Sequence, residues 1–132
     1  MTSDQSDYSY AEDKELVDQF LSWTADAVKE LRELTDSLDG SEGPESSAAD
    51  RIYDLAHNVK GMGSSFNYDL MTTVGTSLCR YIKNGGDRLR PRAIDAHVRI
   101  LEVVLENKIR GDGGEKGQAL EKRLNEIIVE ES

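Results

Sequence analysis

Cysteine is almost absent from this 132-residue chain, which contains only Cys79. A single cysteine cannot form an internal disulfide, so the sequence favours a reduced, cytoplasmic setting. Long apolar runs are missing too: no stretch approaches the roughly 20 apolar residues of a membrane span, and the opening segment MTSDQSDYSYAEDKE has no secretory apolar core. These absences predict an intracellular protein that does not insert into a membrane.

Basic residues are in deficit. The chain has 16 Lys and Arg against 26 Asp and Glu, a formal net charge of -10. Nucleic acids and anionic membrane surfaces are bound by clustered positive charge, so neither is an expected partner. A partner protein with a basic patch would instead be attracted.

The usual metal and nucleotide motifs are also missing. The two histidines, His57 and His97, lie forty residues apart with no cysteine or carboxylate set at ligand spacing, so a zinc site is unsupported. The segment GDGGEKGQ lacks the G-x-x-x-x-G-K-[ST] pattern, and no strand precedes it, so we interpret it as a flexible connector. We expect no bound cofactor and no metal on this chain.

Helical periodicity is what the sequence has in abundance. Apolar residues recur every three or four positions, and no segment alternates with the period of two that marks an exposed strand. Short loops between amphipathic helices favour an antiparallel bundle. We therefore predict an all-α fold, an antiparallel four-helix bundle with an additional C-terminal helix: a flexible lead-in over 1–10, the bundle over 11–110 and the last helix over 115–130.

Capping and turn residues suggest where the four bundle helices begin and end. Ser47 with Asp50 three residues later resembles a helix N-cap, and Pro91 suits a first helical turn. The predicted helices cover about 11–38, 47–65, 68–83 and 92–110. Whether the last helix covers a flank of the bundle or pairs with a partner stays open.

The second helix places one histidine apart from its apolar residues. At about 100° per residue, His57 lies opposite an apolar arc and shares its side with Lys60, Gly61 and Ser64. The arc consists of Ile52, Leu55, Val59, Met62 and Phe66. His57 should therefore face water, with Lys60 one turn along and bare backbone at Gly61.

Each of these residues suits phosphoryl chemistry. An exposed imidazole offers an unprotonated ring nitrogen as a nucleophile near neutral pH. Lys60 can supply positive charge beside a phosphoryl group on His57. Glycine in a helix costs roughly 0.5 to 1 kcal/mol relative to alanine, so Gly61 and Gly63 need a reason. Access for a partner explains Gly61, and tight helix packing explains Gly63.

The stretch AHNVKGMGSSF, inside helices of this kind, resembles a histidine-containing phosphotransfer (HPt) domain. The likeness rests on His, Lys three residues on, Gly and then small residues, and LMTTVGTSLCRYI is similar to the family's next helix. It covers roughly residues 10–110. The resemblance implies a four-helix bundle and a phosphorelay role, in which His57 accepts a phosphoryl group and passes it on.

The resemblance also implies partners and further site residues. His57 would exchange its phosphoryl group with the aspartate of a response-regulator receiver domain or accept it from a hybrid sensor kinase. The Mg²⁺ that the exchange needs would sit in the receiver. No ATP-binding part is visible, so we expect no kinase activity. Some family members hold the imidazole with a glutamine where this chain has Cys79. The residues expected to meet the partner are Tyr53, Ser64, Arg80 and Lys83.

Plainer interpretations stay open beside this one. His57 can be an ordinary surface histidine, Lys60 a solvated charge and Tyr53 a half-exposed aromatic. Cys79 is expected to be a small buried packing residue, and His97, beside an apolar stripe, a partly buried structural histidine. The whole domain can be a helical adaptor that docks a signalling partner without chemistry, or the phosphoacceptor domain of a larger kinase.

Overall fold

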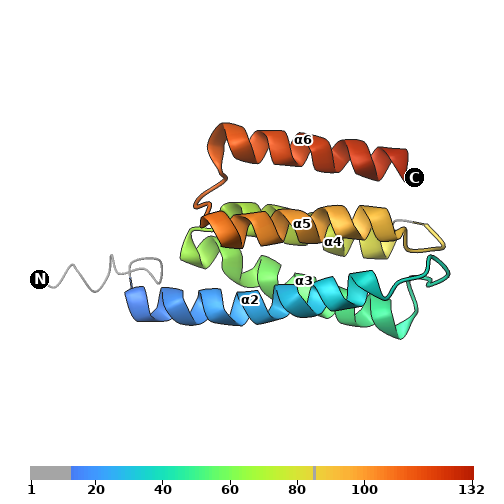
Figure 1. Ribbon diagram of the computed structural model, residues 1–132, viewed down its shortest axis with the longest axis horizontal. Helices are drawn as coiled ribbons and strands as arrows, with labels where there is room; N and C mark the ends of the chain where they lie inside the picture. The colour runs from blue at the N-terminus through green and yellow to red at the C-terminus, as the bar shows by residue number, and fades with distance from the viewer. Residues whose placement is uncertain (1–12, 85) are drawn as a thin grey trace, which may run out of the picture.

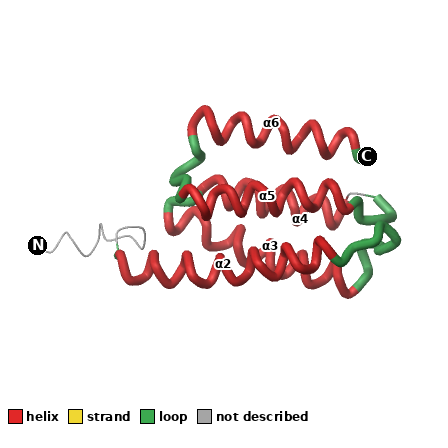
Figure 2. The backbone as a smooth tube through the Cα atoms, in the orientation of Figure 1, coloured by secondary structure: helices red, strands yellow, loops and turns green. Residues whose placement is uncertain are grey.

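The computed structural model describes residues 13–84 and 86–132, and in this part of the chain the regular secondary structure is all helical, without strands. Five α-helices follow one another with short connections (Figures 1 and 2). They are α2 (Lys14–Asp36), α3 (Ser47–Gly63), α4 (Asp69–Asn84), α5 (Pro91–Asn107) and α6 (Gly114–Glu130), and a 3₁₀ turn, η2 (Ser64–Phe66), links α3 to α4. The predicted all-α class is confirmed.

The first four helices form a closed antiparallel bundle. They run alternately up and down, and α2 packs against α3, α3 against α4, α4 against α5, and α5 against α2 (Figure 1). This is the up-down-up-down arrangement that short loops between amphipathic helices produce. The predicted lead-in over 1–10 and the predicted helix start at 11 lie outside the described residues.

Helix ends follow the capping signals, with small shifts. The Asp13 side chain accepts a hydrogen bond from the Leu16 amide at the start of α2. The N-cap of α3 is Ser46, whose hydroxyl oxygen accepts from the Ala49 amide, so the prediction of Ser47 was wrong by one residue. Pro91 stands in the first turn of α5, as predicted.

Aromatic stacking closes the core at one end of the bundle. The ring of Phe20 on α2 lies 4.4 Å from that of Phe66, nearly parallel to it, and 5.7 Å from that of Tyr68. All three side chains are buried. The turn from α3 to α4 is therefore fixed against α2, with Asn67 adopting the left-handed backbone conformation at φ 65° that asparagine tolerates.

Met62 is where the predicted apolar arc was wrong. Its side chain is 40% exposed, whereas Ile52, Leu55, Val59 and Phe66 are buried. The centre of the buried face lies closer to Val59 and Gly63, which leaves Met62 at the edge of α3. Gly63, rather than Met62, lies on the buried face, and a glycine fits there because α3 and α4 approach each other closely.

Small residues let α3 and α4 come together. A Cβ added at Gly63 would lie 2.5 Å from the Thr72 hydroxyl and 2.9 Å from the Tyr68 carbonyl oxygen. A Cβ at Gly75 would lie 3.0 Å from the Ala56 carbonyl oxygen and 3.1 Å from the Lys60 backbone nitrogen. The packing role predicted for Gly63 is confirmed, and Gly75 has the same role on the facing helix.

Charged residues hold α2 against α5. The Arg32 guanidinium donates to both carboxylate oxygens of Glu102, at 3.1 and 3.0 Å, and also bonds Asp95. These hydrogen bonds raise the pKa of Arg32 above its usual range. The paired donors and acceptors suit the planar guanidinium fork and help fix how the two helices align.

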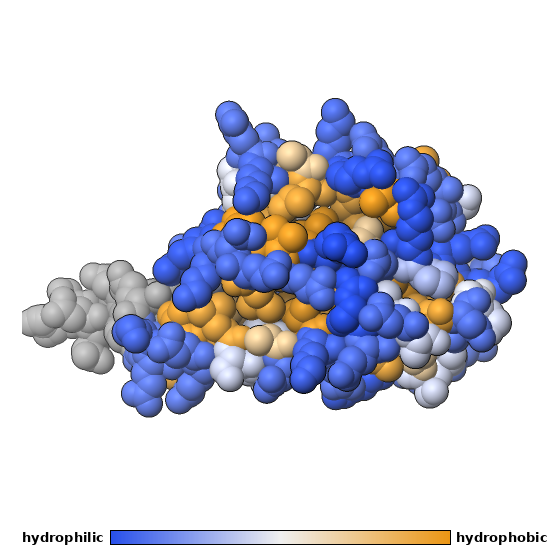
Figure 3. Space-filling model, viewed as in Figure 1, coloured by the Kyte–Doolittle hydropathy of each residue, from blue (hydrophilic) through white to orange (hydrophobic). Residues whose placement is uncertain are grey.

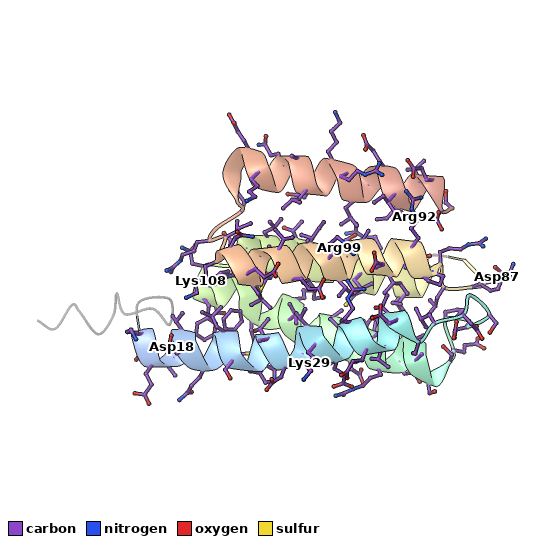
Figure 4. All side chains as sticks on the ribbon, viewed as in Figure 1. Asp18, Lys29, Asp87, Arg92, Arg99 and Lys108 are labelled. Atoms are coloured by element: carbon purple, nitrogen blue, oxygen red, sulfur yellow. The ribbon has the colours of Figure 1, made fainter. Side chains whose placement is uncertain are left out.

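The last helix, α6, lies on the bundle beside α5 (Figure 1). Its Leu124 is buried, and Figure 3 shows apolar residues lining the space between α6 and the bundle. Arg92 at the start of α5 pairs with Glu130 at 2.9 Å and Glu131 at 3.1 Å at the end of α6 (Figure 4). The apolar contact and the ion pairs together seat α6 antiparallel to α5.

Candidate functional site

His57 stands on the water-facing side of α3, as its helical position predicts. Among the described residues, no side chain or backbone group forms a hydrogen bond with either of its ring nitrogens. An imidazole in this setting keeps a lone pair free for a reaction partner that arrives from solvent.

Tyr53 lies one turn before His57 and stacks on it. The two ring centroids are 6.0 Å apart and the ring planes differ by 10°. Tyr53 is half-buried against the core, and the Lys83 ammonium from α4 lies 4.8 Å from the centroid of its ring. The structure therefore groups Tyr53 and Lys83 with His57, across the contact between α3 and α4.

Lys60 is half-buried on α3, one turn after His57. Its positive charge and that of Lys83 both act on the buried thiol of Cys79, whose pKa is raised by burial and lowered less strongly by the two lysines. The two cations thus flank the same part of the α3–α4 contact. Cys79 is a buried packing residue, as predicted, and its main polar neighbour is the Tyr53 carbonyl oxygen at 4.0 Å.

Gly61 leaves the surface beside His57 open. A Cβ built at this glycine would find no atom within 4 Å, apart from its own helix backbone and neighbours. Gly61 therefore has no packing role of the kind seen at Gly63.

Ser64 and Arg80, both predicted to meet a partner, are placed differently. Ser64 is exposed, but its hydroxyl donates to the Thr72 hydroxyl at 3.1 Å, which in turn donates to the Lys60 carbonyl oxygen at 3.1 Å. Arg80 is exposed and lines a cleft between α4 and α6 with Glu121. The structure brings Ser64 to the end of the histidine helix and places Arg80 at the cleft that α4 forms with α6.

Thr72 and Gly75 are the residues of this site that sequence reasoning missed. Thr72 ties the last turn of α3 to α4, and Gly75 lets the backbone of α4 approach Lys60. The pattern that could have found them is a run of small residues at helical spacing on α4, namely Thr72, Gly75, Thr76 and Cys79. Thr72, Gly75 and Cys79 of this run lie against α3, the helix that carries His57.

His97, the other histidine, is fully buried with an exposed fraction of 0%. One ring nitrogen, Nδ1, lies 2.7 Å from the Ala93 carbonyl oxygen, and the other, Nε2, lies 2.9 Å from the Ser77 hydroxyl. Burial lowers the pKa of His97 to about 4. The prediction of a structural histidine fits this position, and the residue is more deeply buried than the sequence suggested.

The arrangement around His57 can present one nucleophilic ring nitrogen to a partner, with two lysines nearby and an unobstructed patch of backbone. Within residues 13–84 and 86–132, no three His, Cys, Asp or Glu side chains gather as ligands for a metal ion. In the same part of the chain, no helix combines the length and apolar character needed to cross a membrane.

Comparison of the sequence with models of known protein families identifies the family of this chain. The family model described as Hpt domain matches residues 15–127, which span nearly all of the four bundle helices and most of α6. Searches of curated proteins and of solved structures found no match. The chain therefore belongs to the histidine-containing phosphotransfer domain family, whose members carry phosphoryl groups on histidine in phosphorelays.

Proposed function

We propose that His57 is the phosphoacceptor of this domain and exchanges its phosphoryl group with the aspartate of a response-regulator receiver. The observation that carries the proposal is the contrast between the only two histidines in the chain. His57 is exposed with no described hydrogen bond to its ring, whereas His97 is buried with both ring nitrogens engaged.

The chemistry is a direct displacement at phosphorus. The lone pair of an unprotonated His57 nitrogen forms an N–P bond while the P–O bond to the receiver aspartate breaks, and the aspartate leaves as a carboxylate. The other ring nitrogen keeps its proton, so the imidazole becomes positively charged. The reverse step returns the phosphoryl group to an aspartate. Such transfer depends mostly on positioning and on compensation of charge.

The neighbours of His57 match those two needs. Lys60, one turn along the same helix, offers positive charge to the phosphoryl oxygens, and Lys83 adds a second cation from α4. Gly61 has no side chain that would obstruct an approaching receiver. Tyr53 and Ser64 border the same exposed face of α3. The exposed side of α3 would be the docking surface.

The domain would act as a shuttle rather than as an enzyme. We infer no ATP-dependent kinase activity, because the described helices are accounted for by the bundle and α6 and the sequence contains no nucleotide-binding pattern. A hybrid sensor kinase, through its receiver, would supply the phosphoryl group, and a response regulator would accept it. The Mg²⁺ for the exchange would be held by the receiver's carboxylates.

The test is transfer of labelled phosphate from a panel of purified, phosphorylated receiver domains with Mg²⁺ present. We expect at least one receiver to label the wild-type domain and none to label His57→Gln. The matched control is Asn125→Gln, an exposed residue on α6 and outside the proposed docking surface, which should be labelled like the wild type.

Two results would overturn the proposal. One is undiminished labelling of His57→Gln. The other is a wild-type domain that binds receivers but takes up no label from any of them, which would support a helical adaptor that docks a signalling partner without chemistry. Circular dichroism of each variant shows whether a lost label reflects lost folding.

A further inference from the structure

The orientation of the His57 ring needs an explanation, because no described group forms a hydrogen bond with it. The residue that faces this part of α3 from α4, Cys79, is a buried thiol with no bond to the ring. An exposed imidazole on a helix would otherwise exchange between rotamers on the nanosecond scale. Only some of those rotamers point a ring nitrogen toward a docked receiver.

We propose that Tyr53 is a positioning residue that holds the His57 imidazole in its reactive orientation, an inference that rests on the function proposed above. Tyr53 lies four residues before His57, the spacing at which helical side chains meet. Its ring lies 6.0 Å from the imidazole, and the two planes are within 10° of parallel. Stacking of this kind favours one family of rotamers of the imidazole.

Parallel stacking suits a nucleophilic imidazole for a geometric reason. The lone pair of the reacting nitrogen lies in the plane of the ring and points outward from its edge. A neighbour that covers a ring face therefore restricts rotation without covering that edge. A hydrogen-bonding neighbour, by contrast, would occupy one of the two nitrogens.

Tyr53 is itself held in place from two sides. Its body packs against the core, and the Lys83 ammonium lies 4.8 Å from its ring centroid, within the range of a cation–π contact. A line of contacts thus runs from Lys83 on α4 through Tyr53 to His57 on α3. Besides the charge that it offers, Lys83 would act on His57 through Tyr53, and its loss would loosen the stack less than the loss of the aromatic ring itself.

Single-turnover transfer from a phosphorylated receiver, measured over a range of receiver concentrations, separates positioning from docking. In Tyr53→Leu we expect the limiting rate to fall about tenfold, with the half-saturating receiver concentration changed less than about twofold. Tyr53→Phe keeps the ring and should stay within about twofold of the wild type in both. Lys83→Met should lower the limiting rate about twofold to threefold, and Lys122→Met, the same change on exposed α6, should not.

Nuclear magnetic resonance of the wild-type domain and the two Tyr53 variants provides a readout that needs no phosphoryl transfer. We expect nuclear Overhauser contacts between the ring protons of Tyr53 and His57. The His57 ring resonances should carry a ring-current shift that Tyr53→Phe retains and Tyr53→Leu loses. Absence of both signals in the folded wild type would overturn the inference.

The kinetic outcomes separate this inference from the proposed function. An unchanged limiting rate in Tyr53→Leu, or a change confined to the half-saturating concentration, would overturn the positioning role while His57-dependent labelling stands. Labelling that survives in His57→Gln would overturn the proposed function itself. A rate that falls equally in Tyr53→Phe and Tyr53→Leu would show that the hydroxyl, not the stacked ring, matters and would also overturn the inference.

Discussion

The two histidines of this chain occupy opposite environments. His57 faces water on α3 and stacks on the ring of Tyr53. Neither of its ring nitrogens forms a hydrogen bond with a residue that the structure describes. His97 is buried where α5 packs on α4, with one nitrogen near the Ala93 carbonyl oxygen and the other near the Ser77 hydroxyl. The same side chain is thus available for chemistry at one site and is part of the core at the other.

The contrast shows that the reactivity of an imidazole is set by what surrounds it. A buried, neutral histidine with both nitrogens engaged stabilises a helix contact but cannot meet a receiver. An exposed histidine can react with a receiver, provided that positive charge lies nearby and no neighbouring side chain blocks the approach of the receiver.

The largest effect should come from exchanging each histidine for glutamine. His57→Gln is expected to lose all labelling by phosphorylated receivers while its unfolding free energy stays within about 0.5 kcal/mol of the wild type. His97→Gln should keep His57-dependent labelling but lose about 1 to 3 kcal/mol of stability, because a buried hydrogen-bonded group is replaced. Labelling assays and urea unfolding check the pair, and equal stability losses in both variants would contradict the assignment.

Acid should destabilise the fold through His97. Its pKa is lowered from 6.5 to about 4 by burial, so between these values the unfolded chain binds a proton that the folded chain does not. The unfolding free energy should therefore fall as the pH drops through this window, by roughly 3 kcal/mol in total from this residue.

The measurement is urea unfolding of the wild type and His97→Gln at several pH values between 7 and 4. Carboxylates titrate in both proteins and largely cancel in the difference. The stability advantage of the wild type should shrink steadily toward pH 4. An advantage that stays constant across the window would show that His97 titrates in the fold as it does in the unfolded chain.

Gly63→Ala should cost stability, because the new Cβ would lie 2.5 Å from the Thr72 hydroxyl and 2.9 Å from the Tyr68 carbonyl oxygen. We expect a loss of about 1 to 3 kcal/mol in unfolding free energy, as for other overpacked positions. Thermal or urea unfolding measures it. A neutral or stabilising outcome would mean that α3 and α4 separate more easily than this contact indicates.

Lys60→Gln should slow transfer without unfolding the domain. Glutamine keeps the Cβ that packs near Gly75 and replaces the charged end of the side chain with a neutral amide. Loss of one nearby cation is expected to lower the transfer rate about fivefold, with Lys122→Gln on α6 as the charge-matched control. Equal transfer rates in the two variants would show that the charge of Lys60 does not contribute to transfer.

Gly61→Ala should change the unfolding free energy the least of these variants, and in the opposite direction to Gly63→Ala. No atom obstructs the added methyl group, so the helix should gain about 0.5 to 1 kcal/mol of stability. Transfer should become slower, because the methyl group stands where the receiver docks. Stability gained with no change in transfer would show that the receiver does not approach at Gly61.

Much of this architecture could be predicted from the sequence. Helical periodicity located the helices, and the angular position of His57 correctly gave an exposed side chain. Periodicity reports which way a residue points from its own helix axis, but not which neighbouring helix it meets. It therefore misplaced Met62, at the edge of the buried face, and could not show that Lys83 meets Tyr53 while Arg80 faces α6.

The contacts between helices are what the sequence could not supply. The stacking of Tyr53 on His57 depends on rotamers, and the close approach at Gly75 depends on how α3 and α4 cross. The position of α6 depends on a pairing of apolar faces that a second molecule could have satisfied equally well. Each of these is decided by tertiary packing.

The most direct test of the account is to map the phosphorylated residue. The wild-type domain would be labelled by a receiver that transfers to it, digested under conditions that preserve phosphohistidine, and analysed by tandem mass spectrometry. We expect the phosphoryl group on His57 and none on His97. A phosphoryl group on His97, or on a residue other than histidine with His57 unmodified, would contradict the account.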